Sequence, residues 1–210
     1  MEAYALTDVG QKRSMNQDSV YARTKSIGSL ENLFIVADGM GGHQAGDFAS
    51  NFVVENLVRF FETPYPERDV HGILKEGIRK VNRDLYECTS RDPKLNGAGS
   101  TLVLATIKGS VLYVANIGDS RLYLLREVLE QITKDHSYVE ELVAMGKLKR
   151  GSRDYLEKKN IITRAVGVSA QVDTDLFALK LKSGDQILMC SDGLSNMVDE
   201  LEIEYIIRSE

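Results

Sequence analysis

The sequence contains three runs of apolar, strand-like residues that each end at an aspartate beside a glycine. The aspartates are Asp38, Asp119 and Asp192, and their glycine neighbours are Gly39, Gly118 and Gly193. A side chain at the end of a buried strand has a rigid support, and the adjacent glycine lets the backbone approach a ligand closely. We therefore expect a fold in which several strands end at acidic side chains.

The repeated aspartates have two interpretations. Carboxylates that converge at strand ends suit hard cations that prefer oxygen ligands, such as Mg²⁺ or Mn²⁺. Asp-Gly and Gly-Asp are also common in tight hairpin turns, so each pair taken alone is equally consistent with a turn. The repetition of the pattern, and the residues that flank the first and last pairs, favour a metal site.

Composition narrows the class of protein. The chain has 210 residues, 43% of them hydrophobic, which is enough for one domain with a proper core over residues 1–210. A net charge of −5 argues against nucleic acid as the partner. The sequence has no apolar stretch long enough to span a membrane, no signal peptide at its start, and only Cys88 and Cys190 as cysteines. We therefore expect a cytoplasmic protein.

Hydrophobic periodicity predicts two long helices in the first half. Apolar residues recur at helical spacing over residues 48–61, before prolines that would end a helix. A second stripe runs from Leu74 to Leu85, with Asp69 as the expected N-cap. His71, near the start of this second helix, is expected on the surface. Short extended segments are expected before these helices, over residues 4–8 and 19–23.

The second half is expected to be mainly antiparallel. Residues 101–107, 111–117 and 121–125 resemble an antiparallel meander, because the connections are too short for parallel crossovers. Residues 135–137 can cap a helix over 138–146, with His136 supporting its start. Strand-like segments follow at 175–181 and 186–191, and Asp199 can cap a last helix over 200–208. Strands in meanders with helices grouped between them predict a layered α+β fold.

Several motifs resemble one known family in their order along the chain. They are Arg13-Ser14-Met15-Asn16-Gln17-Asp18, Asp38-Gly39-Met40-Gly41-Gly42-His43, Gly118-Asp119-Ser120-Arg121, Asp135-His136-Ser137, Ile162-Thr163-Arg164-Ala165-Val166-Gly167 and Ser191-Asp192-Gly193. The chain is similar over nearly its whole length to the bacterial metal-dependent protein phosphatases of the type 2C class. The resemblance implies a four-layer α-β-β-α sandwich, with two antiparallel sheets flanked by helices and a metal site at one end.

The resemblance also implies the chemistry. Two core Mn²⁺ or Mg²⁺ ions would activate a water for direct attack on a phosphomonoester. Asp38 would bridge both metals, the Gly39 carbonyl would complete one of them, and Asp192 would hold the other. Asp119 would serve a third and weaker metal, although a plain turn remains its alternative role.

Three further residues are expected at the active site. Arg13 resembles the family's phosphate-binding arginine, and a guanidinium can bind two phosphoryl oxygens at once. Asp18 is expected to orient a water bound to a metal. His43 could donate a proton to the leaving oxygen, or could be a loop histidine without such a role. The basic residues of 146–160 match the family's variable flap, and could attract acidic phosphoprotein segments or simply form a solvated face.

One departure from the family leaves two functions open. Relatives carry an Asp-Asn pair and a final strand some way beyond the Ser191-Asp192-Gly193 motif, and no counterpart is visible before Glu210. The first hypothesis is a serine/threonine phosphoprotein phosphatase that opposes a kinase and acts on phosphorylated proteins, without nucleic acid or membrane partners. The second is a catalytically impaired or inactive module of the same fold that binds phosphorylated partners. The sequence does not indicate the oligomeric state.

Overall fold

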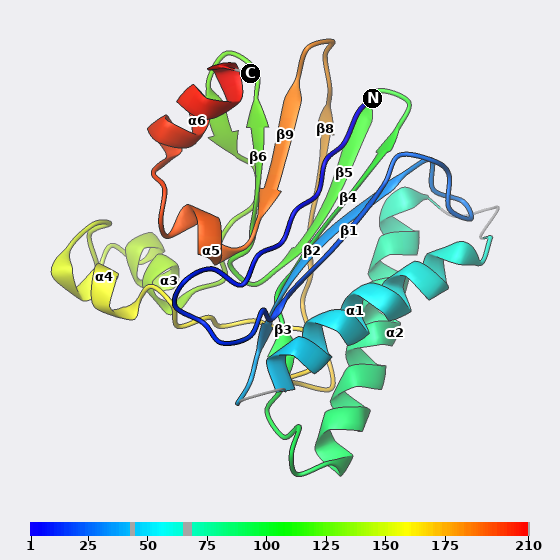
Figure 1. Ribbon diagram of the computed structural model, residues 1–210, viewed down its shortest axis with the longest axis vertical. Coiled ribbons are helices and arrows are strands. Elements are labelled where there is room, and N and C mark those ends of the chain that lie inside the picture. Colours follow the sequence, from blue (N-terminus) through cyan, green and yellow to red (C-terminus); the bar gives the residue numbers. More distant parts are fainter. Residues whose placement is uncertain (43–44, 65–68, 210) are drawn as a thin grey trace.

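The computed structural model describes residues 1–42, 45–64 and 69–209 (Figure 1). Its strands are β1 (Asp18–Arg23), β2 (Leu33–Met40), β3 (Gly99–Ser100), β4 (Leu102–Lys108), β5 (Val111–Ile117), β6 (Arg121–Leu125), β7 (Leu129–Gln131), β8 (Asp175–Lys180) and β9 (Gln186–Cys190). Its helices are α1 (Ala45–Glu62), α2 (Val70–Arg91), α3 (Tyr138–Ala144), α4 (Arg153–Lys158), α5 (Asp192–Ser195) and α6 (Glu200–Ser209).

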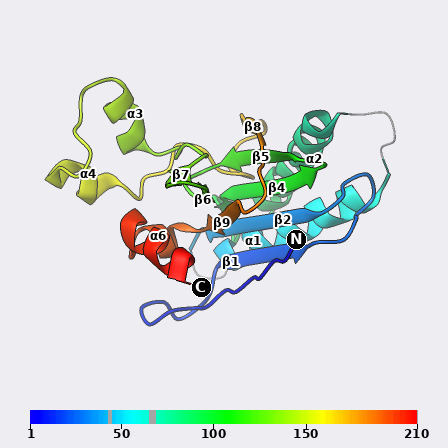
Figure 2. The same ribbon diagram turned by 90° about the horizontal axis from the view of Figure 1, so that it is seen from above.

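The strands form two antiparallel sheets. The larger sheet has six strands in the order β1-β2-β4-β5-β8, with β3 paired to β2, and the smaller has the order β7-β6-β9. Seen from above, the smaller sheet and α6 lie on one side of the larger sheet, and α1 and α2 lie on the other (Figure 2). The layered α+β fold that the sequence pattern predicted is therefore present, with the two antiparallel sheets and flanking helices that the family resemblance implied.

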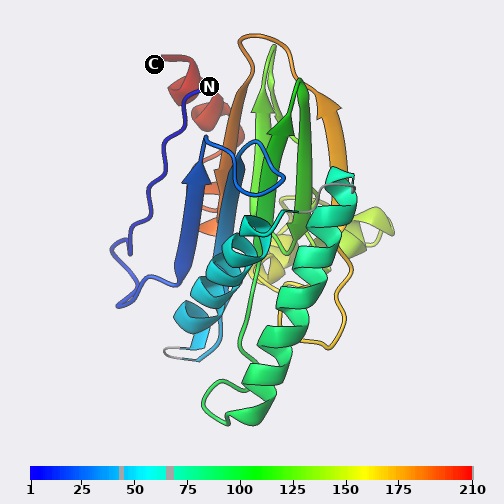
Figure 3. The same cartoon turned by 90° about the vertical axis from the view of Figure 1, so that its right-hand side faces the viewer.

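The two long helices form where the apolar periodicity placed them. Both lie across the outer face of the six-stranded sheet (Figure 3). The buried side chains of α1 and α2, among them Leu57, Leu74, Ile78 and Leu85, share one core with the sheet. Asp69 is the N-cap of α2 as expected, because its side chain accepts a 2.8 Å hydrogen bond from the Gly72 N–H.

Strand β2 separates the two cores and thereby orients Asp38. Successive side chains of a strand point to opposite faces. Leu33, Ile35 and Ala37 pack in the core with α1 and α2, whereas Phe34 and Val36 pack in the second core with residues of the smaller sheet. The same alternation places Asp38 at the end of the face that looks toward the smaller sheet.

The predicted meander is wrong at its second connection. Strands β4 and β5 form a hairpin, but β5 and β6 belong to different sheets, so residues 118–120 cross from one sheet to the other. Residues 182–185 likewise cross from β8 to β9. A short connection rules out a parallel crossover but not a change of sheet, and strand periodicity alone does not specify the partner.

Other local predictions are partly correct. Residues 4–8 form no strand, and the three-residue strand β7 was not expected. Ser137 caps α3, and Asp199 accepts a 2.9 Å hydrogen bond from Glu202 N–H at the start of α6, both as predicted. Within the described ranges, no helix is long and apolar enough to cross a membrane.

The basic segment 146–160 contains the short helix α4. Its position relative to α3 is fixed by Glu140, which accepts a 2.7 Å hydrogen bond from the Tyr155 hydroxyl and pairs with Arg150. Arg153 pairs with Glu157 on the exposed side of α4. The charges of Arg150 and Arg153 are thus offset by Glu140 and Glu157. Residues 146–160 are called the flap below.

Candidate metal-dependent active site

The site is built around two aspartates on adjacent strands. Asp38 on β2 lies directly opposite Asp18 on β1 in the antiparallel register. Opposed residues on a ladder have their side chains on the same face, and like charges in that arrangement destabilise a sheet. The repulsion between these two carboxylates does not stabilise the sheet, and such an unfavourable pair is typical of a functional site.

Asp192 joins these aspartates from the smaller sheet. It begins the four-residue helix α5 immediately after β9 (Figure 1). The preceding Ser191 donates a 2.7 Å hydrogen bond to Asp18 Oδ2, and so links the end of β9 to the start of β1. Asn196 donates a 2.8 Å hydrogen bond to Asp192 Oδ2. Both sheets therefore contribute carboxylates to one end of the sandwich.

Asp119 lies on the crossover between the sheets, not in a hairpin turn. This position removes the turn alternative in its simple form, because no hairpin is formed there. Thr101 connects the crossover to the first aspartate: its hydroxyl oxygen accepts a 2.9 Å hydrogen bond from Asp38 N–H and lies 2.7 Å from the Ser120 hydroxyl. Asp38 and Asp119 thus share one buried support.

The pKa values of these carboxylates reflect their burial and their proximity to one another. Burial, followed by the charges of Asp18 and Asp192 and a side-chain hydrogen bond with Asp192, raises the pKa of Asp38 to about 8. Burial, followed by the charges of Asp192 and Asp135, raises the pKa of Asp119 to about 7. Each charged form is disfavoured in these surroundings unless positive charge is added.

This donor set has the chemistry of a hard-cation site, because divalent cations such as Mg²⁺ and Mn²⁺ prefer carboxylate and carbonyl oxygens and offset the repulsion between neighbouring carboxylates. Across residues 1–42, 45–64 and 69–209, however, no three Asp, Glu, His or Cys side chains are already grouped tightly enough to hold an ion. Asp38 and Asp192 nevertheless lie close enough for each carboxylate to act on the other, and this interaction contributes to the raised pKa of Asp38. The donor atoms are therefore of the type that a divalent cation prefers, and the side chains that carry them lie near one another.

Gly39 is required at its position because the backbone of α1 comes very close. A Cβ on Gly39 would lie 1.9 Å from the Gly46 carbonyl oxygen and 2.9 Å from the Gln17 carbonyl oxygen. The Gly39 N–H donates a 2.9 Å hydrogen bond to that Gln17 oxygen. The residue beside Asp38 is thus fixed between the start of α1 and the segment that leads into β1.

Arg13 lies near the end of β2 but not inside the carboxylate cluster. It is exposed and lines a shallow hollow of about 200 Å³ together with Ser14, Met15, Gln17 and Gly41. The structure therefore brings Arg13 beside the loop that follows Asp38. His43, the candidate proton donor, lies outside the described residues, so its proposed role stays a prediction.

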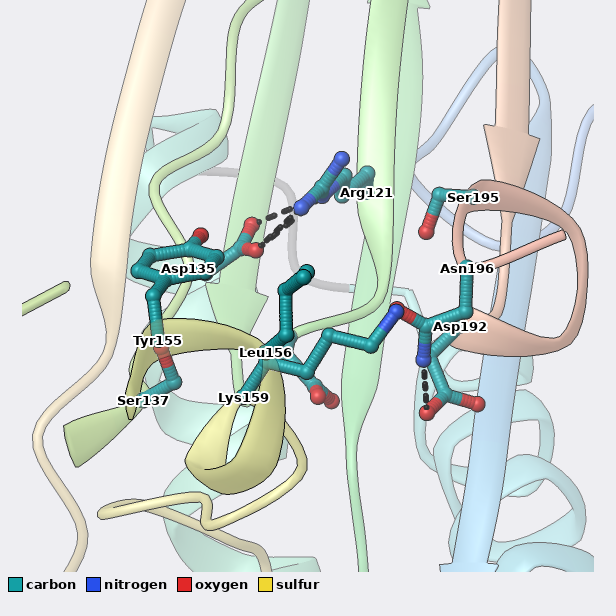
Figure 4. Close-up of a pocket in the computed structure, with 10 residues that line it drawn as sticks. Arg121, Asp135, Ser137, Tyr155, Leu156, Lys159, Asp192, Ser195 and Asn196 are labelled. Atoms are coloured by element: carbon teal, nitrogen blue, oxygen red, sulfur yellow. Dashed lines mark hydrogen bonds and ion pairs between the residues drawn. The ribbon is translucent and has the colours of Figure 1, made fainter. Parts of the chain in front are cut away.

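A second pocket, of about 150 Å³, lies between the flap and α5 (Figure 4). Arg121 and Asp135 form a double hydrogen bond on one side of it, with Arg121 Nη2 2.7 Å from Asp135 Oδ2. Lys159 extends from the end of α4 across the pocket toward Asp192 and Asn196 (Figure 4). The flap thus borders the carboxylate cluster directly, since Asp119 also lines this pocket.

Sequence reasoning missed several supporting residues. Thr101 and Ser191 carried no predicted role, although each lies within a motif or strand that was recognised. His136 does more than support the start of α3, because its ring contacts the Asp119 crossover. The expectation for His71 was wrong: it is half-buried, with its ring edge-on to Tyr113 at 5.1 Å between centroids and Nε2 3.2 Å from the Phe177 carbonyl oxygen.

The shared support predicts a stability effect at Thr101. Thr101→Val removes the hydroxyl but keeps the shape, and leaves Asp38 N–H and the Ser120 hydroxyl without this buried partner. We expect a loss of about 1–3 kcal/mol in the free energy of unfolding, measured with urea. Thr101→Ser keeps the hydroxyl and should lose less, so equal losses in the two variants would contradict the assigned hydrogen bonds.

Comparison with known proteins identifies relatives of this chain in sequence and in structure. The sequence profile described as protein phosphatase 2C matches residues 9–206. The chain is 39% identical to serine/threonine phosphatase stp of Listeria monocytogenes, across all of this chain and 84% of that protein. The crystal structure of Stp1 from Staphylococcus aureus superposes with a TM-score of 0.87 at 33% identity, over 98% of this chain and 81% of that one.

A further solved structure contains metal. The catalytic domain of the serine/threonine protein phosphatase PstP, in complex with two manganese ions, has a TM-score of 0.80 and 35% identity, over 95% of this chain and 80% of that one. The extent of these matches confirms the family that the sequence motifs indicated. The chain is a member of the protein phosphatase 2C family.

Proposed function

We propose that this chain hydrolyses phosphoserine and phosphothreonine esters in proteins with the help of Mn²⁺ or Mg²⁺ ions. The observation that supports this most is the cluster of Asp38, Asp119 and Asp192, which come from two sheets and meet at one end of the sandwich with raised pKa values at the first two. Family membership supports the same reaction class.

The cations would be held by the carboxylates of Asp38 and Asp192 and by the Gly39 carbonyl, with Asp119 and Asp192 serving a further ion. Such ions, when bound, lower the pKa of a water and offset negative charge on the phosphoryl group. Asp18 would orient a water beside Asp38, and the hydrogen bond that holds its Oδ2 to the Ser191 hydroxyl supports this role.

Arg13 would bind the phosphoryl group of the substrate. Arg13 is exposed and lines the hollow that Gly41 also lines. A planar fork of N–H donors can engage two phosphoryl oxygens at once and so orient the ester. In this proposal the aspartates and the Gly39 carbonyl would hold the cations, and Arg13 would hold the substrate.

The substrates would be phosphorylated proteins, the products of a serine/threonine kinase. The pocket between the flap and α5 adjoins Asp119 and Asp192 and contains Lys159, so it offers space and a positive charge for substrate residues next to the phosphoester.

Cys88 and Cys190 are both free thiols, which is in keeping with a reducing compartment such as the cytoplasm.

Phosphate release tests the proposed activity. Phosphoserine and phosphothreonine peptides are incubated with the protein after treatment with a chelator, and Mn²⁺ or Mg²⁺ is then added back. We expect release only after the cation is restored. Hydrolysis that persists in excess chelator would contradict the proposed function, as would a complete lack of hydrolysis at every Mn²⁺ concentration.

A substitution at Arg13 separates substrate binding from chemistry. Arg13→Ala removes a contact that exists both before and during the reaction, so we expect KM for a phosphopeptide to rise about 10- to 100-fold while kcat changes little. Lys12→Ala is the matched control, because Lys12 is the neighbouring exposed cation. Equal effects in the two variants would remove Arg13 from the phosphate-binding role.

A further inference from the structure

His136 holds the residue before Asp119 from both sides. Its backbone N–H donates a 2.9 Å hydrogen bond to the Gly118 carbonyl, and its Nδ1 accepts a 3.1 Å hydrogen bond from the Gly118 N–H. The ring is buried, with 6% exposure. Both polar groups of the Gly118 backbone therefore bind one histidine that is 18 residues away in the sequence.

The hydrogen bonds determine the ring tautomer of His136. An Nδ1 that accepts from a backbone N–H carries no proton, so the neutral ring carries its proton on Nε2. Nε2 lies 3.2 Å from Asp175 Oδ2 and can donate to it. Asp175 is held in turn by Arg164, whose Nη1 lies 2.9 Å from Asp175 Oδ1 and 3.3 Å from His136 Nε2. The orientation of the ring is thus set from strand β8.

Contacts other than those of His136 also restrict the backbone of the crossover, residues 118–120. Gly118 has a φ of +99°, and a Cβ there would lie 2.7 Å from Thr101 Cγ2. Asn116, at the end of β5, donates a 3.0 Å hydrogen bond to the Lys134 carbonyl, so the segment that carries His136 is fixed along the end of that strand. The position of Asp119 is therefore determined by a small number of named contacts.

We propose that His136 is a positioning residue that fixes the backbone at Gly118, so that the Asp119 carboxylate is held ready for a divalent cation. The inference rests on the proposed function, in which Asp119 is a metal ligand. Asp175 and Arg164 act through His136, because they fix its tautomer and the orientation of its ring. Outer hydrogen bonds of this kind orient the side chains around metal sites in many proteins. The backbone of His136 is also held by the segment that follows the flap, because Thr163 N–H donates a 2.8 Å hydrogen bond to the His136 carbonyl.

Two substitutions divide the contacts of the ring between them. In His136→Asn the side-chain oxygen can take the place of Nδ1 and accept from Gly118 N–H. In His136→Gln the longer amide reaches toward Asp175 but loses the acceptor beside Gly118. We expect His136→Gln to weaken Mn²⁺ binding about tenfold and His136→Asn to weaken it much less. The measurement is a calorimetric titration of the chelator-treated protein with Mn²⁺, well below the unfolding temperature of each variant.

Two reference variants make the result interpretable. Asp119→Asn identifies which Mn²⁺ binding step depends on that carboxylate, and His71→Gln tests the loss of a different histidine, which is half-buried and lies on α2. If Asp119→Asn leaves every binding step unchanged, the ligand assignment in the proposed function fails. If Asp119→Asn weakens a step that His136→Gln leaves unchanged, or if His136→Asn and His136→Gln weaken it equally, the positioning role is overturned.

A further variant avoids any change to the histidine. Asp175→Asn withdraws the carboxylate that holds the Nε2 proton, at a residue whose side chain is 35% exposed. We expect a larger fraction of the Nδ1-protonated tautomer in nitrogen NMR of the His136 ring, together with weaker binding at the step that Asp119→Asn identifies. An unchanged tautomer combined with unchanged Mn²⁺ affinity would also overturn the proposal.

Discussion

Asp38→Asn is expected to lower kcat/KM for a phosphopeptide by at least about a thousandfold at saturating Mn²⁺. The reason is that this carboxylate is proposed to bind both core cations, whose charge stabilisation is worth several kcal/mol in the transition state. An amide keeps the size of the side chain but supplies no negative charge to offset two neighbouring cations. The measurement is steady-state phosphate release over a range of Mn²⁺ concentrations.

The fold should survive this change. Asn resembles the protonated form of Asp38, which burial and neighbouring charges favour in the absence of cations. Asp84→Asn is the matched control, because Asp84 lies on the outer surface of α2 in an ion pair with Lys80. Near wild-type turnover of a folded Asp38→Asn protein would show that Asp38 is not a metal ligand.

The stability of the chelator-treated protein is expected to fall as the pH rises from about 5 to about 8. The pKa values of Asp38 and Asp119 are raised in the folded state to about 8 and about 7, from ordinary values near 3.8. Between these limits the folded state binds more protons than the unfolded state, so each unit of rising pH favours unfolding. We expect the melting temperature to fall by at least about 5 °C over this range.

Mn²⁺ should reverse this trend. A cation replaces the protons on the carboxylates, so the increase in melting temperature that Mn²⁺ produces should be larger at pH 8 than at pH 6. Differential scanning calorimetry at matched ionic strength measures both effects. A melting temperature that rises steadily toward pH 8 in chelator, or an effect of Mn²⁺ that shrinks with pH, would contradict the assigned carboxylate cluster.

The sequence predicted the elements more successfully than their partners. Apolar periodicity located α1 and α2 within a few residues and predicted the Asp69 cap, because helices are determined largely by local patterns. The same reasoning placed β5 and β6 in one meander, whereas they lie in different sheets. A change of sheet depends on how the two sheets converge, and that packing leaves no periodic signal in a three-residue connection.

In the candidate site, too, local features could be predicted from the sequence while tertiary contacts could not. Asp38, Asp119 and Asp192 could be named as candidates from the sequence because each follows a recognisable strand or lies within a motif, and their roles stay a prediction. The hydrogen bond from Ser191 to Asp18 joins residues 173 positions apart, and the contact of His136 with Gly118 spans a change of sheet. Such supports are fixed by tertiary packing, so the motifs containing these residues were visible in the sequence while their roles were not.

The most direct test of the central claim is to locate the cation. Crystals of the protein grown with Mn²⁺ would be measured at the manganese absorption edge, where anomalous scattering identifies the ion. We expect anomalous peaks within about 2.5 Å of carboxylate oxygens of Asp38 and Asp192 and of the Gly39 carbonyl oxygen. Crystals of catalytically active protein whose only manganese peaks lie away from Asp38 and Asp192 would contradict the account.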